Sequence, residues 1–169
     1  AGVTTALVLT SLDDATGVAV GAAAITTISG TATEVKAVLD AHTASTISLD
    51  ADYKVSITGA NMANADVARI NSLAADSSGT ITGTFGTLTL TQANNLATLD
   101  AQDAITLTEV TATANAAAID ALDDKTSGSM IFADAQVAIG NLSSLSLATV
   151  NQTITGTGGK MLVTGTAGG

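Results

Sequence analysis

Residues 46–122 read TISLDADYKVSITGANMANADVARINSLAADSSGTITGTFGTLTLTQANNLATLDAQDAITLTEVTATANAAAIDAL. The same order of predicted elements occurs three times in this stretch: a short strand rich in Thr and Ile, then Gly or Thr, then an Ala-rich helix. In the strand segments an apolar residue alternates with Thr or Ser, which is the pattern of a half-buried strand. The helical segments carry apolar pairs at i and i+3, which lie on one helix face: Val67 and Ile70, Leu96 and Leu99, Ile119 and Leu122.

This alternation predicts specific elements. The expected strands are residues 46–49, 53–59, 80–82, 87–90, 105–108 and 110–113, and the expected helices are residues 63–75, 92–101 and 115–122. Similar apolar pairs at Val35/Val38 and, more loosely, at Val137/Leu142 extend the pattern in both directions. The distance between successive pairs drifts from roughly 32 to roughly 20 residues, within the range of solenoid repeats.

The predicted fold is therefore a β/α repeat solenoid, with short Thr-rich strands alternating with short Ala-rich helices and with strand-rich ends. One domain is expected over residues 1–169: a strand-rich N-terminal part at 1–30, the strand/helix repeats at 31–144, and a β C-terminal cap at 145–169. The alternative is an ordinary α+β domain with a single core whose elements happen to alternate.

The flanking segments complete the expected element order. Strands are expected at 4–10, 17–20, 24–29, 129–133, 145–150, 153–155 and 160–164, and a weaker helix at 135–144. A first helix is expected at 33–41, with Thr33 as its N-terminal cap and Glu34 in its first turn, where the helix dipole favours an anion. Residues 123–128 form the most obvious loop.

Composition excludes several classes of function. The net charge of −10 and the absence of a basic patch argue against binding to nucleic acid or to an anionic membrane surface. No cysteine is present, which excludes disulfides, thiolate catalysis and zinc–thiolate sites. Aromatic residues are 2% of the chain, so the core must be thin, and a glycan-hydrolysing cleft lined by stacking rings is not expected. The longest early uncharged run, residues 15–33, is diluted by Gly, Thr and Ser and is not expected to insert into a membrane.

No residue is predicted to be catalytic, to bind a cofactor or to bind a metal. His42, the one histidine, is expected to complement the end of the first helix. The segment Gly156-Thr-Gly-Gly-Lys160 fails as a phosphate-binding loop, because Ile154 stands where Gly is needed and Met161 where Ser or Thr is needed. It is expected to be a hairpin turn.

Aspartates cluster at the expected turns: Asp50 with Asp52, Asp100 with Asp103, and Asp120 with Asp123 and Asp124. Such oxygens can hold calcium, but neither the twelve-residue calcium loop nor the glycine-rich nonapeptide is present. Solvated turn aspartates are the favoured interpretation, and calcium stays an alternative without a motif.

Thr-x-Thr patterns recur at Thr80/Thr82/Thr84, Thr87/Thr89/Thr91, Thr106/Thr108, Thr111/Thr113 and Thr153/Thr155/Thr157. On one flat face, such an array could order water and resemble the ice-binding surfaces of insect and bacterial antifreeze proteins. The simpler interpretation is that Thr fills the solvent side of the strands.

Two runs carry a family resemblance, TISGTATEVKAVLDAHTASTISL (residues 27–49) and AITLTEVTATANAAAIDALDD (residues 104–124). They resemble the tandem-repeat regions of very large secreted or surface proteins of bacteria, especially cyanobacteria, and the resemblance extends over residues 24–144. It implies an extracellular, repetitive, non-enzymatic segment. The calcium-binding nonapeptides that often accompany such regions are missing here.

The sequence therefore predicts a structural or adhesive element of a bacterial cell-surface or extracellular assembly, able to associate end to end. The expected partners are other copies of the same protein or cell-surface components. The alternative is a ligand-binding module that binds ice through the Thr-x-Thr face, or binds glycan or calcium.

Overall fold

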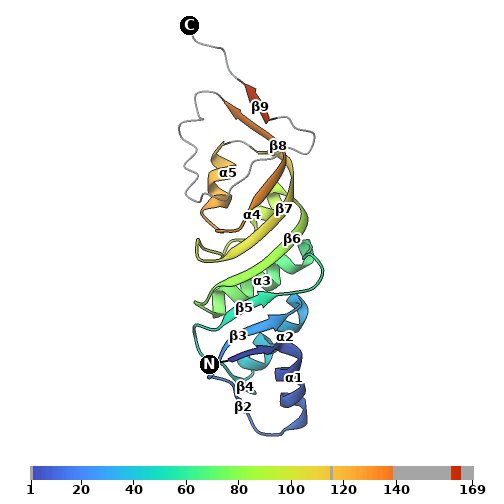
Figure 1. Cartoon of the computed structure of the whole chain (residues 1–169), viewed down its shortest axis with the longest axis vertical. Helices are drawn as coiled ribbons and strands as arrows, with labels where there is room; N and C mark the ends of the chain where they lie inside the picture. The colour runs from blue at the N-terminus through green and yellow to red at the C-terminus, as the bar shows by residue number, and fades with distance from the viewer. Residues whose placement is uncertain (1, 115, 139–160, 165–169) are drawn as a thin grey trace. The chain divides into compact units, whose positions relative to one another are not determined.

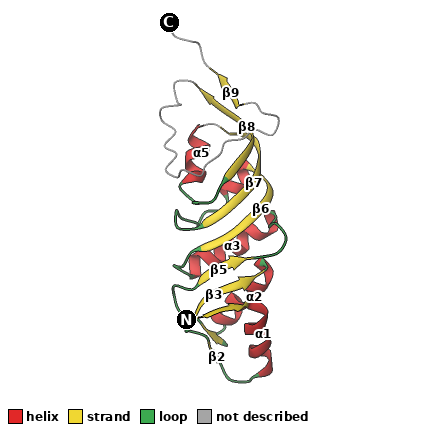
Figure 2. Cartoon of the chain, viewed as in Figure 1, coloured by secondary structure: helices red, strands yellow, loops and turns green. Residues whose placement is uncertain are grey.

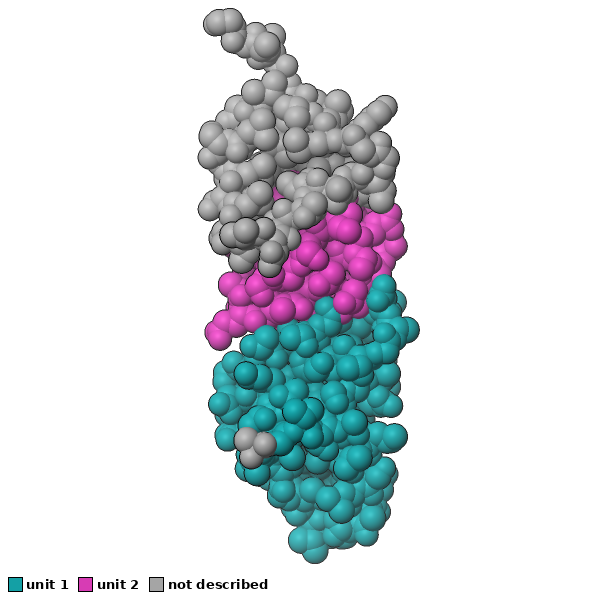
Figure 3. All heavy atoms as spheres, viewed as in Figure 1, with its two compact units in different colours: residues 1–83 teal, residues 84–169 magenta. Residues whose placement is uncertain are grey.

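The computed structural model describes residues 2–114, 116–138 and 161–164. The chain divides into two compact units, residues 1–83 and residues 84–169 (Figure 3). The boundary falls inside one strand, β6 (Ile81–Thr89). Both units combine strands and helices (Figure 2).

Unit 1 is a parallel sheet with helices in its crossover connections. Its strands pair in chain order, β1 with β3, β3 with β5, and β5 with the first residues of β6, and all these pairs are parallel. A separate parallel pair joins β2 to β4. The elements are β1 (Gly2–Thr5), α1 (Ala6–Ala15), β2 (Val20–Gly21), β3 (Ile25–Gly30), α2 (Ala32–Thr43), β4 (Ile47–Ser48), β5 (Lys54–Ile57) and α3 (Asn64–Asp76).

The register of unit 1 separates an apolar face of the sheet from a hydroxyl-bearing one. Ile28, Val55 and Ile81 are partners across three strands, and all three are buried. The next residue along each strand points to the opposite face, because side chains alternate. These residues are Ser29, Ser56 and Thr82, which are also partners and are half-buried.

Helix α2 packs against both α1 and α3. Its apolar stripe of Val35, Val38 and Leu39 is buried, as are Val67 and Ile70 of α3. The i, i+3 pairs of the sequence therefore mark the inward faces of these helices, as expected.

The cap of α2 differs from the expected one. Thr31, rather than Thr33, begins the helix, and it forms a reciprocal capping box with Glu34. The backbone N–H of Thr31 donates to Glu34 Oε2 over 2.8 Å, and the N–H of Glu34 donates to Thr31 Oγ1 over 3.3 Å. The reason is spacing, since the reciprocal pair needs a Glu three residues after the capping hydroxyl.

Unit 2 contains the rest of β6 and then α4 (Leu90–Asn94), β7 (Ala104–Ala114), α5 (Ala116–Asp123), β8 (Met130–Ala138) and β9 (Met161–Thr164). The strand order is β6-β7-β8-β9, with β7–β8 and β8–β9 parallel. Leu107 pairs with Met130 and Val110 with Phe132, and all four side chains are buried.

The predicted β/α repeat solenoid is wrong. The structure has a mostly parallel sheet with helices of an α/β kind, and the described residues show no repeating coil. Helix length varies from 5 residues in α4 to 13 in α3. The helix expected at 92–101 is wrong beyond Asn94, since Leu96 and Leu99 are buried in the connection that follows α4. The strands expected at 46–49 and 53–59 are separate strands, β4 and β5. In the next two repeats the expected pairs merge, since 80–82 and 87–90 fall in or beside β6, and 105–108 and 110–113 both fall in β7.

Gly83 lies inside β6, at a point where the sheet leaves no room for a side chain. A Cβ at this position would lie 2.7 Å from Met62 Cε and 3.0 Å from Ile57 Cβ. Gly inside a strand often marks such a close approach of neighbouring groups. The segment Thr82-Gly83-Thr84 is part of β6, and the close approach of Met62 and Ile57 requires glycine at its centre.

The expectation of a strand-rich N-terminal part is wrong for residues 6–15, which form α1, capped by Thr5, whose Oγ1 accepts from Val8 N–H over 3.3 Å. A short apolar run of this kind fits a strand or a buried helix equally well by pattern alone. The expected strand at 24–29 is confirmed as β3.

At the other end of the chain, the helix expected at 135–144 is wrong for residues 135–138, which belong to β8 and pair with β9. Residues 139–144 and the expected strands at 145–150 and 153–155 lie outside the described residues. The strand expected at 160–164 is confirmed over 161–164. The single domain expected over residues 1–169 stays a prediction.

Gly128 offers a test of the packing in unit 2. A Cβ on this residue would overlap the backbone of Ile105. We expect Gly128→Ala to lower the free energy of unfolding by about 3 kcal/mol, because backbone atoms cannot rearrange as a flexible side chain can. Gly17→Ala is the control, since a Cβ there meets nothing within 4 Å. Urea unfolding followed by circular dichroism measures both, and equal stability of the two variants would contradict this account.

Candidate functional site

His42 lies in the last turn of α2, as expected, and it organises the connection from this helix to β4. Its Nδ1 lies 3.1 Å from the carbonyl oxygen of Ile47 and 3.3 Å from the backbone nitrogen of Leu49. Both contacts are to the backbone, so the histidine shapes the turn.

The turn aspartates accept hydrogen bonds from backbone N–H groups of the same turns. Asp50 Oδ1 accepts from Ala51 N–H over 2.8 Å, and Asp100 Oδ1 accepts from Gln102 N–H over 2.8 Å. Asp103 is buried, and its Oδ2 accepts from Asp100 N–H over 3.2 Å. Within the described ranges, no group of three or more His, Cys, Asp or Glu side chains is placed to hold a metal ion.

The Thr-x-Thr hydroxyls are used between strands. Thr82 donates to Val55 O over 3.2 Å, Thr108 to Phe85 O over 2.9 Å, and Thr111 to Leu88 O over 3.3 Å. Each hydroxyl proton therefore satisfies a carbonyl of the neighbouring strand. Thr153, Thr155, Thr157 and the segment 156–160 lie outside the described residues.

Sequence reasoning missed a pair of buried hydroxyl turns, one in each unit. In unit 1 the turn is Ser77-Ser78-Gly79, after α3. Ser77 Oγ donates to Tyr53 O, and the backbone N–H of Ser78 donates to Ala51 O over 3.0 Å. Gly79 N–H donates back to Ser77 Oγ over 3.0 Å. The turn thereby holds the chain just before β5 against the start of β6.

In unit 2 the equivalent turn is Thr126-Ser127-Gly128, after α5. Thr126 is buried, and its Oγ1 accepts from Ile105 N–H over 2.8 Å and lies 3.1 Å from Asp103 O. Ser127 N–H donates to Asp103 O over 2.8 Å, and Gly128 N–H donates to Thr126 Oγ1 over 3.0 Å. This turn fixes the entry to β7 beside the start of β8.

A sequence signal for these turns exists. Both follow an Ala-rich helix and both read Ser/Thr-Ser-Gly immediately before a strand. Burial of the first hydroxyl is what makes the turn a structural anchor.

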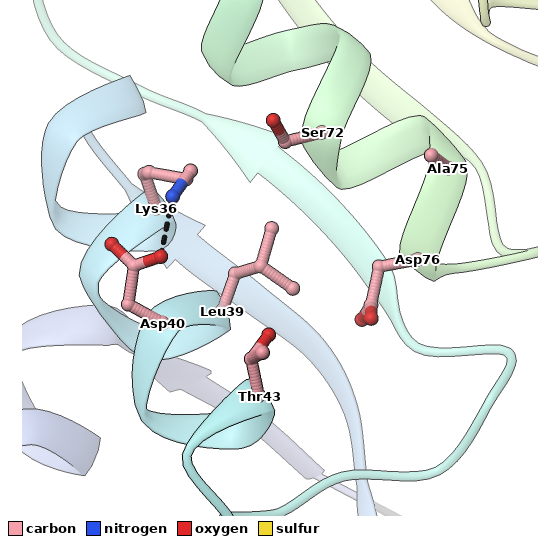
Figure 4. Close-up of a pocket in the computed structure, with 7 residues that line it drawn as sticks. All are labelled: Lys36, Leu39, Asp40, Thr43, Ser72, Ala75 and Asp76. Carbon is pink, nitrogen blue, oxygen red and sulfur yellow. Dashed lines mark hydrogen bonds and ion pairs between the residues drawn. The ribbon is translucent and has the colours of Figure 1, made fainter.

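A groove of about 370 Å³ lies between α2 and α3 (Figure 4). Leu39 projects into it, and Lys36 and Asp40 form an ion pair on the α2 side. On the α3 side, Asp76 Oδ2 accepts from the hydroxyl of buried Tyr53 over 2.8 Å. Burial, and then the hydrogen bond and the negative charge of Asp76, raise the pKa of Tyr53 well above its usual value.

The largest exposed apolar side chains of the described residues gather at the start of unit 1. Val3 of β1 is 73% exposed, and Leu7, Val8 and Leu12 of α1 are 60%, 57% and 51% exposed. Val18, in the loop after α1, is 75% exposed. We call Leu7, Val8 and Leu12 of α1, with the outer edge of β1, the β1–α1 surface (Figure 1). Val3 is the partner of Thr27 and therefore points to the sheet face opposite that of Ile28.

This surface combines an unpaired strand edge with an exposed apolar helix face. β1 is the first strand in the sheet order, so its outer edge presents N–H and C=O groups that pair with no strand of the described residues. Helix α1 buries Ala6 and Leu9 and exposes apolar side chains on its other side. A helix that is apolar on both sides normally has protein on both sides.

No family model, no curated protein and no solved structure matches the chain in comparisons of its sequence and structure. In the part of the chain that the structure describes, no helix is both long and apolar enough to cross a membrane.

The buried hydroxyl of Thr126 can be tested by an isosteric change. Thr126→Val removes the hydroxyl and leaves Ile105 N–H buried without this acceptor. We expect the free energy of unfolding to fall by about 2 kcal/mol, the typical cost of an unsatisfied buried group. Thr126→Ser keeps the hydroxyl and should recover most of the loss in urea unfolding. A Val variant as stable as the Ser variant would show that the hydroxyl does not anchor the turn.

Tyr53 predicts a dependence of stability on high pH. Because its pKa is raised in the folded state, its contribution is complete below the ordinary value of 10.0 and is lost as pH rises above it. We expect the free energy of unfolding to fall less steeply above pH 10.0 in Tyr53→Phe than in the unaltered chain.

Asp76→Asn separates the causes of this shift. Burial is the largest cause, so this variant should retain most of the high-pH loss. Denaturant melts at several pH values measure all three proteins. A Phe variant with the same slope as the unaltered chain would contradict the assignment to Tyr53.

Proposed function

We propose that this chain is a structural element of a protein assembly, which associates with another protein chain through the β1–α1 surface. The observation that supports this most directly is the coincidence of an open strand edge with an exposed apolar helix face. A single added strand–helix unit would cover both.

The edge has no side-chain protection against association, although β1 itself is short, at four residues. Natural proteins commonly block an exposed edge strand with a charged side chain, a proline or a bulge that turns it away. The strand Gly2-Val3-Thr4-Thr5 has no charged residue and no proline, and α1 carries no charge before Asp13. The irregularity in β1–β3 pairing, between Gly2 and Val3, concerns the inner edge. These features favour a surface that is buried against another protein chain.

The proposed setting is a bacterial cell surface or extracellular assembly, with a passive rather than catalytic role and with an adhesive role included. The support comes from composition. The chain has no cysteine and no proline, is acidic and is rich in Ala and Thr, and its sequence pattern resembles the repeat regions of large surface proteins. Nucleic acid is a poor partner for a chain of net charge −10.

A ligand-binding role through the Thr-x-Thr face draws less support. The protons of Thr82, Thr108 and Thr111 are engaged with neighbouring carbonyls, so these hydroxyls offer a ligand only acceptor capacity. The assembly role does not require these threonine hydroxyls to donate hydrogen bonds to a ligand.

The proposal is tested by light scattering and negative-stain electron microscopy over a range of protein concentrations. We expect molar mass to rise with concentration in the unaltered chain. Val8→Glu should abolish the rise, because it places a charge in the apolar stripe. It should also preserve the fold, since Glu three residues after the cap Thr5 completes a capping box.

Ala37→Glu is the matched control, because it adds the same charge at an exposed position of α2. It should associate like the unaltered chain. A chain that stays single at every concentration, or association that survives Val8→Glu, would contradict the proposal.

A further inference from the structure

We infer that the partner at the β1–α1 surface is a second copy of this chain, related by a two-fold axis, with β1 antiparallel to β1 and α1 antiparallel to α1. This inference rests on the proposed function and names its partner. It follows from the placement of the strand edge, the helix stripe and the charges of α1.

A two-fold axis perpendicular to the sheet satisfies both open features together. Such an axis keeps the helices of the two copies on the same side of the joined sheet. The edge of β1 then pairs with itself, and the exposed stripe of α1 packs on itself. An interface of this kind uses the same patch on both copies and closes at the dimer.

The stripe on α1 has the form needed for helix packing. Leu7, Val8, Ser11 and Leu12 occupy one face, because positions separated by one, four and five residues share a helix side. Ser11 stands in the middle of the helix and is exposed. A small central residue lets two helices approach to the usual separation of about 8–10 Å.

The charges of α1 favour an antiparallel neighbour. The helix has no acidic residue in its first turn and no basic residue in its last turn. It carries Asp13 and Asp14 near its C-terminal end instead, where the negative end of the dipole disfavours carboxylates. Asp13 accepts from the hydroxyl of Thr46 in its own chain over 2.9 Å. In the antiparallel dimer the carboxylate of Asp14 approaches the N-terminal end of the other α1, whose dipole attracts it.

The same charges argue against a lipid bilayer as the partner. Asp14 borders the stripe, and the chain contributes no lysine or arginine before Lys36. An anionic bilayer would be repelled at this surface. A second copy offers apolar contact with compensation of the carboxylates.

The dimer is expected to be weak and reversible. Stable interfaces bury about 800 Å² on each partner. A four-residue strand and a ten-residue helix, about 15 Å long, present less than that. Sedimentation velocity should therefore show a monomer–dimer equilibrium with nothing larger than the dimer.

Single cysteines test the two-fold geometry directly, because the chain has none of its own. Ser11→Cys places a thiol near the proposed axis, within reach of the same thiol on the other copy. We expect mild oxidation to give severalfold more disulfide dimer than Ala37→Cys, whose exposed thiol lies on α2. Equal cross-linking of the two variants would overturn the two-fold arrangement.

Asp14→Lys tests the charge argument. We expect this variant to dimerise several-fold more weakly than the unaltered chain, with a difference that shrinks as salt is raised. Unchanged dimerisation would overturn the antiparallel placement of α1.

The outcomes separate this inference from the proposed function. Open-ended species without Ser11→Cys cross-linking would mean head-to-tail association, which overturns the two-fold dimer and leaves the assembly role standing. A single chain at all concentrations would overturn both. A single chain that binds phosphatidylcholine vesicles, and loses that binding in Val8→Glu, would assign the surface to lipid and overturn the inference.

Discussion

In each unit a buried hydroxyl satisfies backbone groups at the start of one strand and holds the next strand beside it, β5 with β6 in unit 1 and β7 with β8 in unit 2. Ser77 and its neighbours hold the carbonyls of Ala51 and Tyr53 beside the start of β6. Thr126 binds the backbone of Ile105 beside the start of β8. Parallel strands have no tight hairpin to fix their register, so another contact must do so. In both units a Ser/Thr-Ser-Gly turn supplies it, with Gly where a side chain would overlap the neighbouring backbone.

In unit 1, strand addition in chain order has a necessary consequence for the surface. Along the order β1-β3-β5-β6 each strand pairs with the next, and α2 packs against α1 and α3. β1 and α1 stand first in this order among the described residues. β1 and α1 therefore keep one strand edge and one apolar face that the described residues leave open. The same pairing rules that build unit 1 thus define the chemistry of what would cover it: a strand with free N–H and C=O groups beside a helix with an apolar face.

Local sequence rules recovered what depends on local interactions. The inward faces of α2 and α3, the strand β3 and the terminal strand β9 were predictable from apolar spacing and alternation. The solenoid was not a correct extrapolation, because the strands expected at 80–82 and 87–90 belong to one strand, β6, in which Gly83 packs closely against Met62 and Ile57, both distant in sequence. The end of β8 follows its pairing with β9 rather than the preference of Ala. The open edge at β1 was also not predictable. The apolar run at 4–10 predicts a strand where α1 forms, and only the sheet order identifies which strand lies at the edge.

Hydrogen exchange measured at low and high protein concentration tests the central claim, that the β1–α1 surface is an assembly interface, most directly. The account predicts slower exchange at high concentration in peptides covering β1 and α1, because pairing of the edge engages its amides. Peptides from α3 should exchange equally at both concentrations. Exchange at β1 and α1 that is independent of concentration, or slowing that appears only elsewhere in the chain, would contradict the account.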